Sequence, residues 1–183
     1  DRDDPACPDT SRSRCTHHVK IALATGNANK VEELSELLDG VEVTGAPDGF
    51  DVHETGSTLL QNAWLKAAEL RRIAPADTIV VSDDSGLFVH ALGGRPGIFS
   101  ARYAGPSATF DDNCRRLLEE LASTDDRRAC FATVLVGLGA DGAVYVAEGS
   151  CPGVITTAPR GERGFGYDPV FQPMDDSGGR TMA

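Results

Sequence analysis

The sequence has 183 residues, of which 40% are hydrophobic and 25% are charged, and its formal net charge is −11. This length is enough for one domain with a sizeable core and too short for two ordinary domains. The negative charge argues against a nucleic-acid-binding surface, which is usually basic. The longest apolar stretches are strand-sized, well below the ~20 residues that cross a membrane. We therefore expect a globular domain that binds neither nucleic acid nor a membrane.

The five cysteines include no pair with C-x-x-C spacing. An odd number of cysteines at irregular spacing predicts neither a disulfide framework nor a zinc site, and a reducing cytoplasm is the simplest setting for it. Residues 1–18 form a polar segment without the apolar stretch of a signal peptide. We interpret residues 1–18 as a disordered or artefactual tail and residues 19–183 as the folded domain.

Hydrophobic periodicity defines the elements in the first half of the domain. A helix begins near Lys30 and ends near Gly40, and its inward face consists of Val31, Leu34, Leu37 and Leu38. The other expected elements are a buried strand at 19–24, a short strand at 41–44, a loop at 48–58, a helix at 58–73 and a buried strand at 78–82.

The second half of the domain is richer in strands. Asp141-Gly142 is a strong hairpin signal between two strands. The expected elements are a helix at 110–121, strands at 129–138, 144–149 and 153–157, and a glycine-rich segment at 161–168. The order β-α-β, then α-β, then α and a β-meander predicts an α/β fold with a mixed central β-sheet flanked by helices.

The segment Thr25-Gly26-Asn27-Ala28-Asn29-Lys30 joins the first strand to the first helix. Unpaired backbone N–H groups and the helix dipole favour an anion at a helix N-terminus, and Lys30 adds a positive charge. The segment lacks the G-x-x-x-x-G-K-[ST] pattern of a P-loop. It is either a phosphate cradle or an ordinary strand-turn-helix connection with a capping asparagine.

Asp83 and Asp84 directly follow the apolar strand at 78–82. In open α/β sheets, ligands bind beyond the carboxyl ends of the strands. Usually only one of two adjacent acids faces such a site, where a carboxylate can bind Mg²⁺ and accept a proton from water. A solvated turn is the alternative. Ser85 lacks the G-x-S-x-G context of a nucleophile, so serine-hydrolase chemistry is not expected.

Glu54 and Lys66 lie on either side of the start of the second helix. A carboxylate in the loop before this helix can be a second metal ligand, although most loop glutamates are only solvated. Lys66 lies close to the apolar face of the helix, so it either reaches along that face to solvent or contacts a phosphate.

The last candidate site is Phe165-Gly166-Tyr167-Asp168. Two aromatic side chains among glycines can stack on a base, and an aspartate can accept hydrogen bonds from ring N–H groups. A tight turn with two core aromatics explains the same pattern.

Together these segments resemble the inosine-triphosphate pyrophosphatase family of house-cleaning enzymes, from about Lys20 onward. Each segment alone is a weak signal, but their order and spacing are specific. The main segments are T-G-N-A-N-K at 25–30, E-T-G at 54–56, Q-N-A at 61–63, S-D-D-S-G-L at 82–87, G-G-R-P-G-I-F-S-A-R-Y at 93–103 and F-G-Y-D-P-V-F at 165–171.

The resemblance implies a homodimer of two-lobed subunits with the active site in a cleft between the lobes. The reaction would be hydrolysis of ITP, dITP and XTP to the monophosphate and pyrophosphate. Asp84 would bind Mg²⁺ and activate water, and Glu54 would be the second Mg²⁺ ligand. The substrate would contact Thr25, Gly26, Asn27, Ala28, Asn29, Lys30, Lys66, Ser85, Phe165, Gly166, Tyr167 and Asp168.

The chain departs from the family at its C-terminal end. Family members carry a further lysine and a Ser-His-Arg segment that bind substrate, and neither follows Asp168 here. We therefore expect a missing C-terminal portion and an incomplete base-reading site. A truncated nucleotide-binding relic with little turnover is the main alternative. A receiver-type phospho-acceptor, with an acyl phosphate on Asp83 or Asp84, leaves segments 25–30 and 165–168 unexplained.

Overall fold

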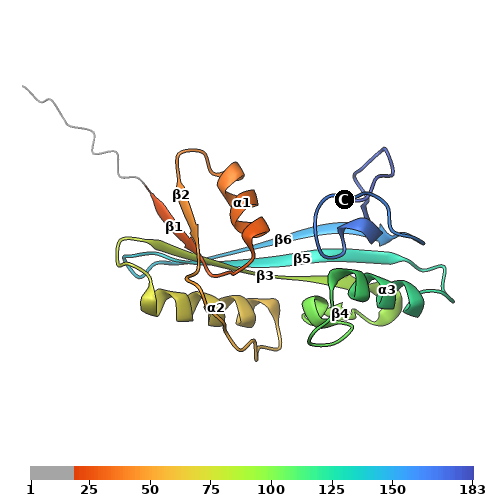
Figure 1. Ribbon diagram of the computed structural model, residues 1–183, viewed down its shortest axis with the longest axis horizontal. Coiled ribbons are helices and arrows are strands. Elements are labelled where there is room, and N and C mark those ends of the chain that lie inside the picture. The colour runs from red at the N-terminus through yellow and green to blue at the C-terminus, as the bar shows by residue number, and fades with distance from the viewer. Residues whose placement is uncertain (1–18) are drawn as a thin grey trace, which may run out of the picture.

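The computed structural model describes residues 19–183 (Figure 1). The tail predicted at residues 1–18 lies outside the described residues. Across residues 19–183, every helix is too short or too polar to cross a membrane.

The described residues form α-helices and one mixed β-sheet. The helices are α1 (Ala28–Leu37), α2 (Leu59–Ile73) and α3 (Phe110–Glu120), with short 3-10 helices at His90–Leu92, Ser100–Arg102 and Asp168–Val170. The strands are β1 (Lys20–Leu23), β2 (Glu42–Gly45), β3 (Ile79–Val89), β4 (Pro96–Gly97), β5 (Arg128–Leu138), β6 (Val144–Ile155) and β7 (Phe171–Pro173).

The strand order is β2-β1-β3-β5-β6-β7, and β4 pairs with β3 beside this path. β1 pairs in parallel with β2 and β3, whereas β3, β5, β6 and β7 pair in antiparallel fashion. In Figure 1, α1 is drawn above the twisted strands, and α2 and α3 are drawn below them. Along β3, Val80 packs in the core of α2, whereas Leu87, which faces the opposite way, packs in the core of α3. This arrangement confirms the predicted α/β fold with a mixed central sheet.

Two hydrophobic cores lie toward opposite ends of β3. The first joins α2 to the sheet through Ala63, Leu70 and Val80, and the second joins α3 to the sheet through Leu87 and Leu117. Burying one leucine side chain completely stabilises a fold by about 1.5–3 kcal/mol, so each core holds its own end of the sheet. The two cores are the basis of the predicted two lobes.

β3 is longer than the sequence predicts. The predicted strand ends at Ser82, but β3 continues to Val89 because each residue from Val80 to Val89 pairs with a residue of β5. Gly86 does not break the strand. A Cβ at this position would lie 2.5 Å from the carbonyl oxygen of Gly97, so glycine lets β4 approach β3 closely. The predicted strand end is therefore wrong, and Asp84 lies in the middle of β3.

The packing of α1 also differs from the prediction. α1 has no buried residue, and Leu37 is 79% exposed. The predicted inward position of Leu37 is therefore wrong. The helix instead depends on its N-terminus, where the Asn27 side chain accepts a hydrogen bond from the N–H of Asn29.

The C-terminal strands differ from the predicted ones in their number and bounds. The strands predicted at 144–149 and 153–157 form the single strand β6, and β7 was not predicted. Pro152 is tolerated inside β6 because its nitrogen faces away from β5, on the side where its carbonyl oxygen accepts a hydrogen bond from the N–H of Met174.

Candidate active site

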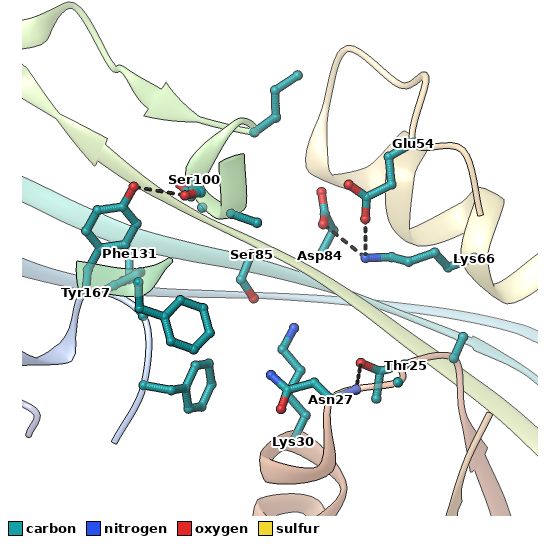
Figure 2. A pocket seen from close by; sticks show the side chains of 18 of the residues that line it. Thr25, Asn27, Lys30, Glu54, Lys66, Asp84, Ser85, Ser100, Phe131 and Tyr167 are labelled. Carbon is teal, nitrogen blue, oxygen red and sulfur yellow. Dashed lines mark hydrogen bonds and ion pairs between the residues drawn. The ribbon is translucent and has the colours of Figure 1, made fainter. Parts of the chain in front are cut away.

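A cavity of about 510 Å³ opens between the two lobes (Figure 2). One wall comes from the β1–α1 connection, α2 and β3, and the other comes from α3 and the segment after β6. The predicted site residues that line it are Thr25, Gly26, Asn27, Lys30, Glu54, Lys66, Asp84, Ser85, Phe165, Gly166, Tyr167 and Asp168. Ala28 and Asn29 are exposed in the first turn of α1 and are not part of the lining.

Asp84 and Glu54 converge on a single ammonium group (Figure 2). Nζ of Lys66 donates to Oδ1 of Asp84 and to Oε1 of Glu54, both at 3.1 Å. The Lys66 side chain is only 14% exposed. Of the two alternatives open for Lys66, the structure therefore favours a role inside the site over a charge extended into solvent.

The second oxygen of each carboxylate also accepts a hydrogen bond. Nδ2 of Asn62 donates to Oδ2 of Asp84 at 3.2 Å, and Nη1 of Arg102 donates to Oε2 of Glu54 at 3.2 Å. Asn62 is fully buried, and its Oδ1 accepts from the N–H of Gly56 at 2.8 Å. Asn62 thus ties Asp84 to the loop that carries Glu54.

Burial and charge move the pKa values of this cluster in different directions. Burial raises the pKa of Asp84, although Lys66 opposes the shift. Burial also acts to raise the pKa of Glu54, but Lys66 and Arg102 outweigh it and hold that pKa below its usual range. Burial favours the neutral amine of Lys66, yet the charges of Asp84 and Glu54 raise its pKa. Asp84 is therefore the better proton acceptor of the two acids, and Lys66 remains an ammonium.

Asp83 points to the opposite face of the sheet from Asp84, because successive side chains of a strand alternate. There its Oδ2 forms an ion pair with Nζ of Lys30 from α1. Ser85 shares this face, donates to Asp83 at 3.3 Å and lies 2.7 Å from Oγ1 of Thr133. The lysines of α1 and α2 consequently flank β3 from two sides (Figure 2).

The turn before α1 is fixed by two hydrogen bonds from backbone N–H groups to side chains of the turn. Oγ1 of Thr25 accepts from the N–H of Asn27 at 3.1 Å, and Oδ1 of Asn27 accepts from the N–H of Asn29 at 3.0 Å. Both bonds fix the turn while the helix N-terminus and Lys30 remain beside the cavity. A helix dipole and a lysine together favour a phosphate here.

The segment at 165–168, called the aromatic loop below, is held in place by a hydrogen bond within it and by one from α3. Oδ2 of Asp168 accepts from the N–H of Phe165 at 2.8 Å, and Sγ of Cys114 donates to the carbonyl oxygen of Gly166 at 3.3 Å. The ring of Phe165 lies 6.2 Å from that of Phe110, between centroids, and both rings line the cavity. The loop therefore presents a fixed apolar surface to a ligand.

Tyr167 has a different position from its neighbour Phe165. It is buried in the core around α3, and its hydroxyl donates to the carbonyl oxygen of Ser100 at 2.9 Å. Only part of Tyr167 borders the cavity. Phe165 is thus the better placed of the two rings for stacking on a base.

Sequence reasoning gave no role to Asn62 or Arg102. A signal for Asn62 was available, since it lies four residues before Lys66 and therefore on the same side of the helix. No local signal marks Arg102, because its contact with Glu54 depends on how the two lobes are joined.

The residues of the cluster fit Mg²⁺ by their chemistry. Glu54 and Asp84 direct carboxylate oxygens at one point beside the cavity, and Mg²⁺ is typically held by one or two carboxylates, substrate phosphates and water. Within residues 19–183, no group of three or more His, Cys, Asp or Glu side chains is arranged to hold a metal. Phosphate and water oxygens would therefore have to complete the coordination.

Comparison with known proteins gives consistent matches. The model of the Ham1 family matches residues 21–183. The dITP/XTP pyrophosphatase of Shigella flexneri is 48% identical over 90% of this chain and 85% of its own length, and that of Geobacillus kaustophilus is 47% identical over 90% and 82%.

Solved structures agree with these matches. The Ham1 protein of Staphylococcus aureus has a TM-score of 0.76 and 39% identity over 90% of this chain and 85% of its own. The nucleoside-triphosphatase, or dITP/XTP pyrophosphatase, of Mycobacterium abscessus has a TM-score of 0.71 and 37% identity over 90% and 88%.

Proposed function

The chain belongs to the Ham1 family, and from this premise we propose that it hydrolyses the deaminated purine nucleoside triphosphates ITP, dITP and XTP to the monophosphate and pyrophosphate. The observation that carries the proposal is the convergence of Asp84 and Glu54 on Lys66, beside a cavity that Lys30 and Phe165 also line. The names of the relatives, dITP/XTP pyrophosphatases, support the substrate class.

Asp84 is proposed as the general base. The oxygen of a water molecule forms a bond to phosphorus while its proton passes to the Asp84 carboxylate. The bridging P–O bond between the α- and β-phosphates breaks, and pyrophosphate leaves. The raised pKa of Asp84 makes its carboxylate a better proton acceptor than an ordinary aspartate, and a positioned general base typically contributes a factor of about 10²–10⁴.

The positive groups around β3 are proposed to bind the triphosphate. Lys30 approaches from α1 and Lys66 from α2, and the N-terminus of α1 adds its dipole. We also propose that Glu54 and Asp84 hold Mg²⁺, which when bound neutralises charge on the phosphoryl oxygens.

The aromatic loop is proposed to recognise the base. Phe165 would stack on the purine ring, with Phe110 beside it in the cavity wall. Asp168 uses Oδ2 to hold the loop, which leaves Oδ1 for a ring N–H of a 6-oxopurine. Adenine has an acceptor at the corresponding nitrogen, and a buried site with the wrong hydrogen-bond pattern rejects such a base strongly.

Pyrophosphate release tests this function. Release is measured from ITP, dITP, XTP, ATP and GTP, with and without Mg²⁺, for the wild type and for Asp84→Asn. We expect release from the first three in the presence of Mg²⁺ and release slower by a factor of about 10²–10⁴ with Asp84→Asn. Equal rates on ATP and ITP contradict the substrate class, and no release from any substrate contradicts the activity.

We further propose that the chain acts as a homodimer in the cytoplasm. An apolar groove of about 520 Å³ between α2 and β6 is lined by Leu60, Trp64 and Val146, among other residues. The edge of β6 beside it is exposed at Val144 and Tyr145. An exposed apolar groove beside an open strand edge favours pairing with a second copy. The described cysteines are free, in keeping with a reducing compartment.

A further inference from the structure

The two acids of the candidate metal site are already neutralised by side chains of the protein. Glu54 and Asp84 carry two negative charges, and Lys66 and Arg102 bring two positive charges into contact with them. The next acid along β3, Asp83, has its own lysine on the other face of the sheet. The cluster therefore offers little net attraction to a cation that arrives alone.

The carboxylate oxygens are also occupied one by one. Lys66 donates to one oxygen of each acid, Arg102 to the second oxygen of Glu54, and Asn62 to the second oxygen of Asp84. A divalent cation that binds both acids must share oxygens with an ammonium or displace it. Two cations on the same oxygens repel strongly where the cavity walls limit screening by water.

Of the side chains that donate to the two carboxylates, Lys66 is the one best able to move away from them. Its head group sits on a flexible four-carbon stem with freely rotating N–H donors, and its side chain lines the cavity. Asn62, in contrast, is fully buried and anchored to Gly56. The Lys66 ammonium can therefore exchange its carboxylate partners for phosphate oxygens without any movement of α2.

We propose that Lys66 serves as the resident cation of the carboxylate pair, so that a divalent metal binds tightly only together with a triphosphate. The triphosphate supplies the negative charge that draws in the metal and the oxygens that receive Lys66. This inference rests on the proposed function for the identity of the ligand, but it concerns the order in which metal and substrate are bound.

Direct binding of Mn²⁺, a spectroscopic substitute for Mg²⁺, tests the proposal without any turnover. Free Mn²⁺ is measured by electron paramagnetic resonance with protein alone, with a non-hydrolysable α,β-imido analogue of ITP alone and with both together, so that the Mn²⁺ chelated by the analogue in solution is subtracted. For the wild type we expect weak binding of Mn²⁺ alone and affinity at least about tenfold higher with the analogue. For Lys66→Met we expect Mn²⁺ alone to bind at least about tenfold more tightly than to the wild type, because the competing charge is gone.

Two further variants serve as controls. Lys66→Arg keeps the charge and should keep metal binding weak. Lys30→Met makes the same change in net charge on the other face of the sheet, where the lysine contacts Asp83 and neither metal-site acid, so it should not raise the affinity for Mn²⁺ alone. A merely destabilised protein would lose metal binding, whereas the proposal requires a gain.

Two results would overturn the proposal. One is wild-type binding of Mn²⁺ alone that is as tight as binding with the analogue. The other is a Lys66→Met variant with unchanged or weaker Mn²⁺ binding. If Lys66→Met does not fold, as judged by circular dichroism, Arg102→Met removes the second cation and must raise the affinity in its place. Absence of pyrophosphate release would refute the proposed function and leave these binding measurements valid.

Discussion

Asp83 and Asp84 are neighbours on β3, yet each pairs with a lysine on a different face of the sheet: Asp83 with Lys30 of α1, and Asp84 with Lys66 of α2. Only Asp84 reaches the cluster that contains Glu54. The two acids therefore have the same chemistry and different surroundings, which gives their substitutions different expected effects.

Asparagine substitutions separate the two acids. Asp84→Asn removes the proposed general base and should lower kcat by a factor of about 10²–10⁴. Asp83→Asn changes a group that faces Lys30 and should lower kcat by less than about tenfold. Steady-state kinetics with ITP measures both variants, and equal losses in kcat would contradict the assignment of Asp84.

Asn62 should matter for activity beyond its contribution to stability. Asn62→Leu preserves the size of the side chain but removes the bonds to Asp84 and Gly56, at a cost of about 1–3 kcal/mol in the free energy of unfolding. Because the variant also releases Asp84 and the loop that carries Glu54 from the same side chain, kcat should fall at least about tenfold.

Ser82→Ala is the matched control for Asn62→Leu. Ser82 is fully buried at the same interface between α2 and β3, and its hydroxyl donates to the carbonyl oxygen of Ala63 at 2.6 Å. Its loss should cost about 0.5–1.5 kcal/mol and leave kcat nearly unchanged. Thermal unfolding and kinetics measure both variants. Similar losses of kcat in the two would reduce Asn62 to a structural residue.

The two aromatics of the loop should respond differently to substitution. Phe165→Ala removes the ring proposed to stack on the base, which is worth about 1–3 kcal/mol, and should raise KM for ITP about five- to 150-fold. Tyr167→Phe removes only the bond to Ser100, so it should lower the free energy of unfolding by about 0.5–1.5 kcal/mol with little change in KM. A larger rise in KM for Tyr167→Phe than for Phe165→Ala would reverse the assignment.

Glu120 should stabilise the lobe around α3 in a pH-dependent way. Burial acts to raise its pKa, but hydrogen bonds from Tyr103 and Arg116 outweigh burial and lower it. The pKa of Glu120 is lower in the folded state than in the unfolded state, where it has the ordinary value of 4.5. The stabilisation is therefore fully present above pH 4.5 and is lost as the pH falls through the folded-state pKa.

Glu120→Gln measures this effect. At pH 7 the variant should be less stable than the wild type by less than about 1 kcal/mol, because the two arginines that pair with Glu120 are about half exposed and their charges are screened by water. The difference should shrink as the pH is lowered below 4.5. Thermal unfolding across this range checks it, and a difference independent of pH would show that the charge of Glu120 is irrelevant.

Substitution in the apolar groove tests the proposed dimer. Trp64 is 43% exposed and lines the groove between α2 and β6, so Trp64→Glu should convert a dimer into a monomer. Ile73→Glu is the control, since Ile73 is an exposed apolar residue at the far end of α2 and outside the groove. Light scattering after size-exclusion chromatography gives the mass, and an unchanged mass for Trp64→Glu would exclude this surface.

The sequence is informative about elements whose signals are local. The strand at 20–23, the helix at 59–73 and the hairpin at Asp141-Gly142 all follow from hydrophobic periodicity and turn residues. The path of β3 does not, because its pairing with β5 continues past Ser82 to Val89, and the close approach of Gly97 to Gly86 is a tertiary contact. Tertiary pairing thus decides where this strand ends.

The candidate site, like the fold, has one part that the sequence predicts and one part that only the tertiary structure determines. Acids and lysines can be recognised by their types and positions, and the fold does bring Glu54, Lys66 and Asp84 together. Their detailed pairing, with Lys66 between the two acids and Arg102 behind Glu54, depends on the geometry of two lobes. No spacing along the chain encodes that geometry.

Successive side chains of β3 point to opposite faces of the sheet, so the site depends on whether the number of residues before Asp84 in the strand is odd or even. Deleting one residue between Val80 and Asp83 would turn Asp84 toward α1 and would expose Leu87 and Val89, which are now fully buried. Deleting two residues would restore the facing of every side chain, but it would also move Asp84 about 6–7 Å along the strand from Lys66. Single-residue insertions and deletions in this short stretch should therefore damage the fold far more than double ones, whereas both should impair catalysis.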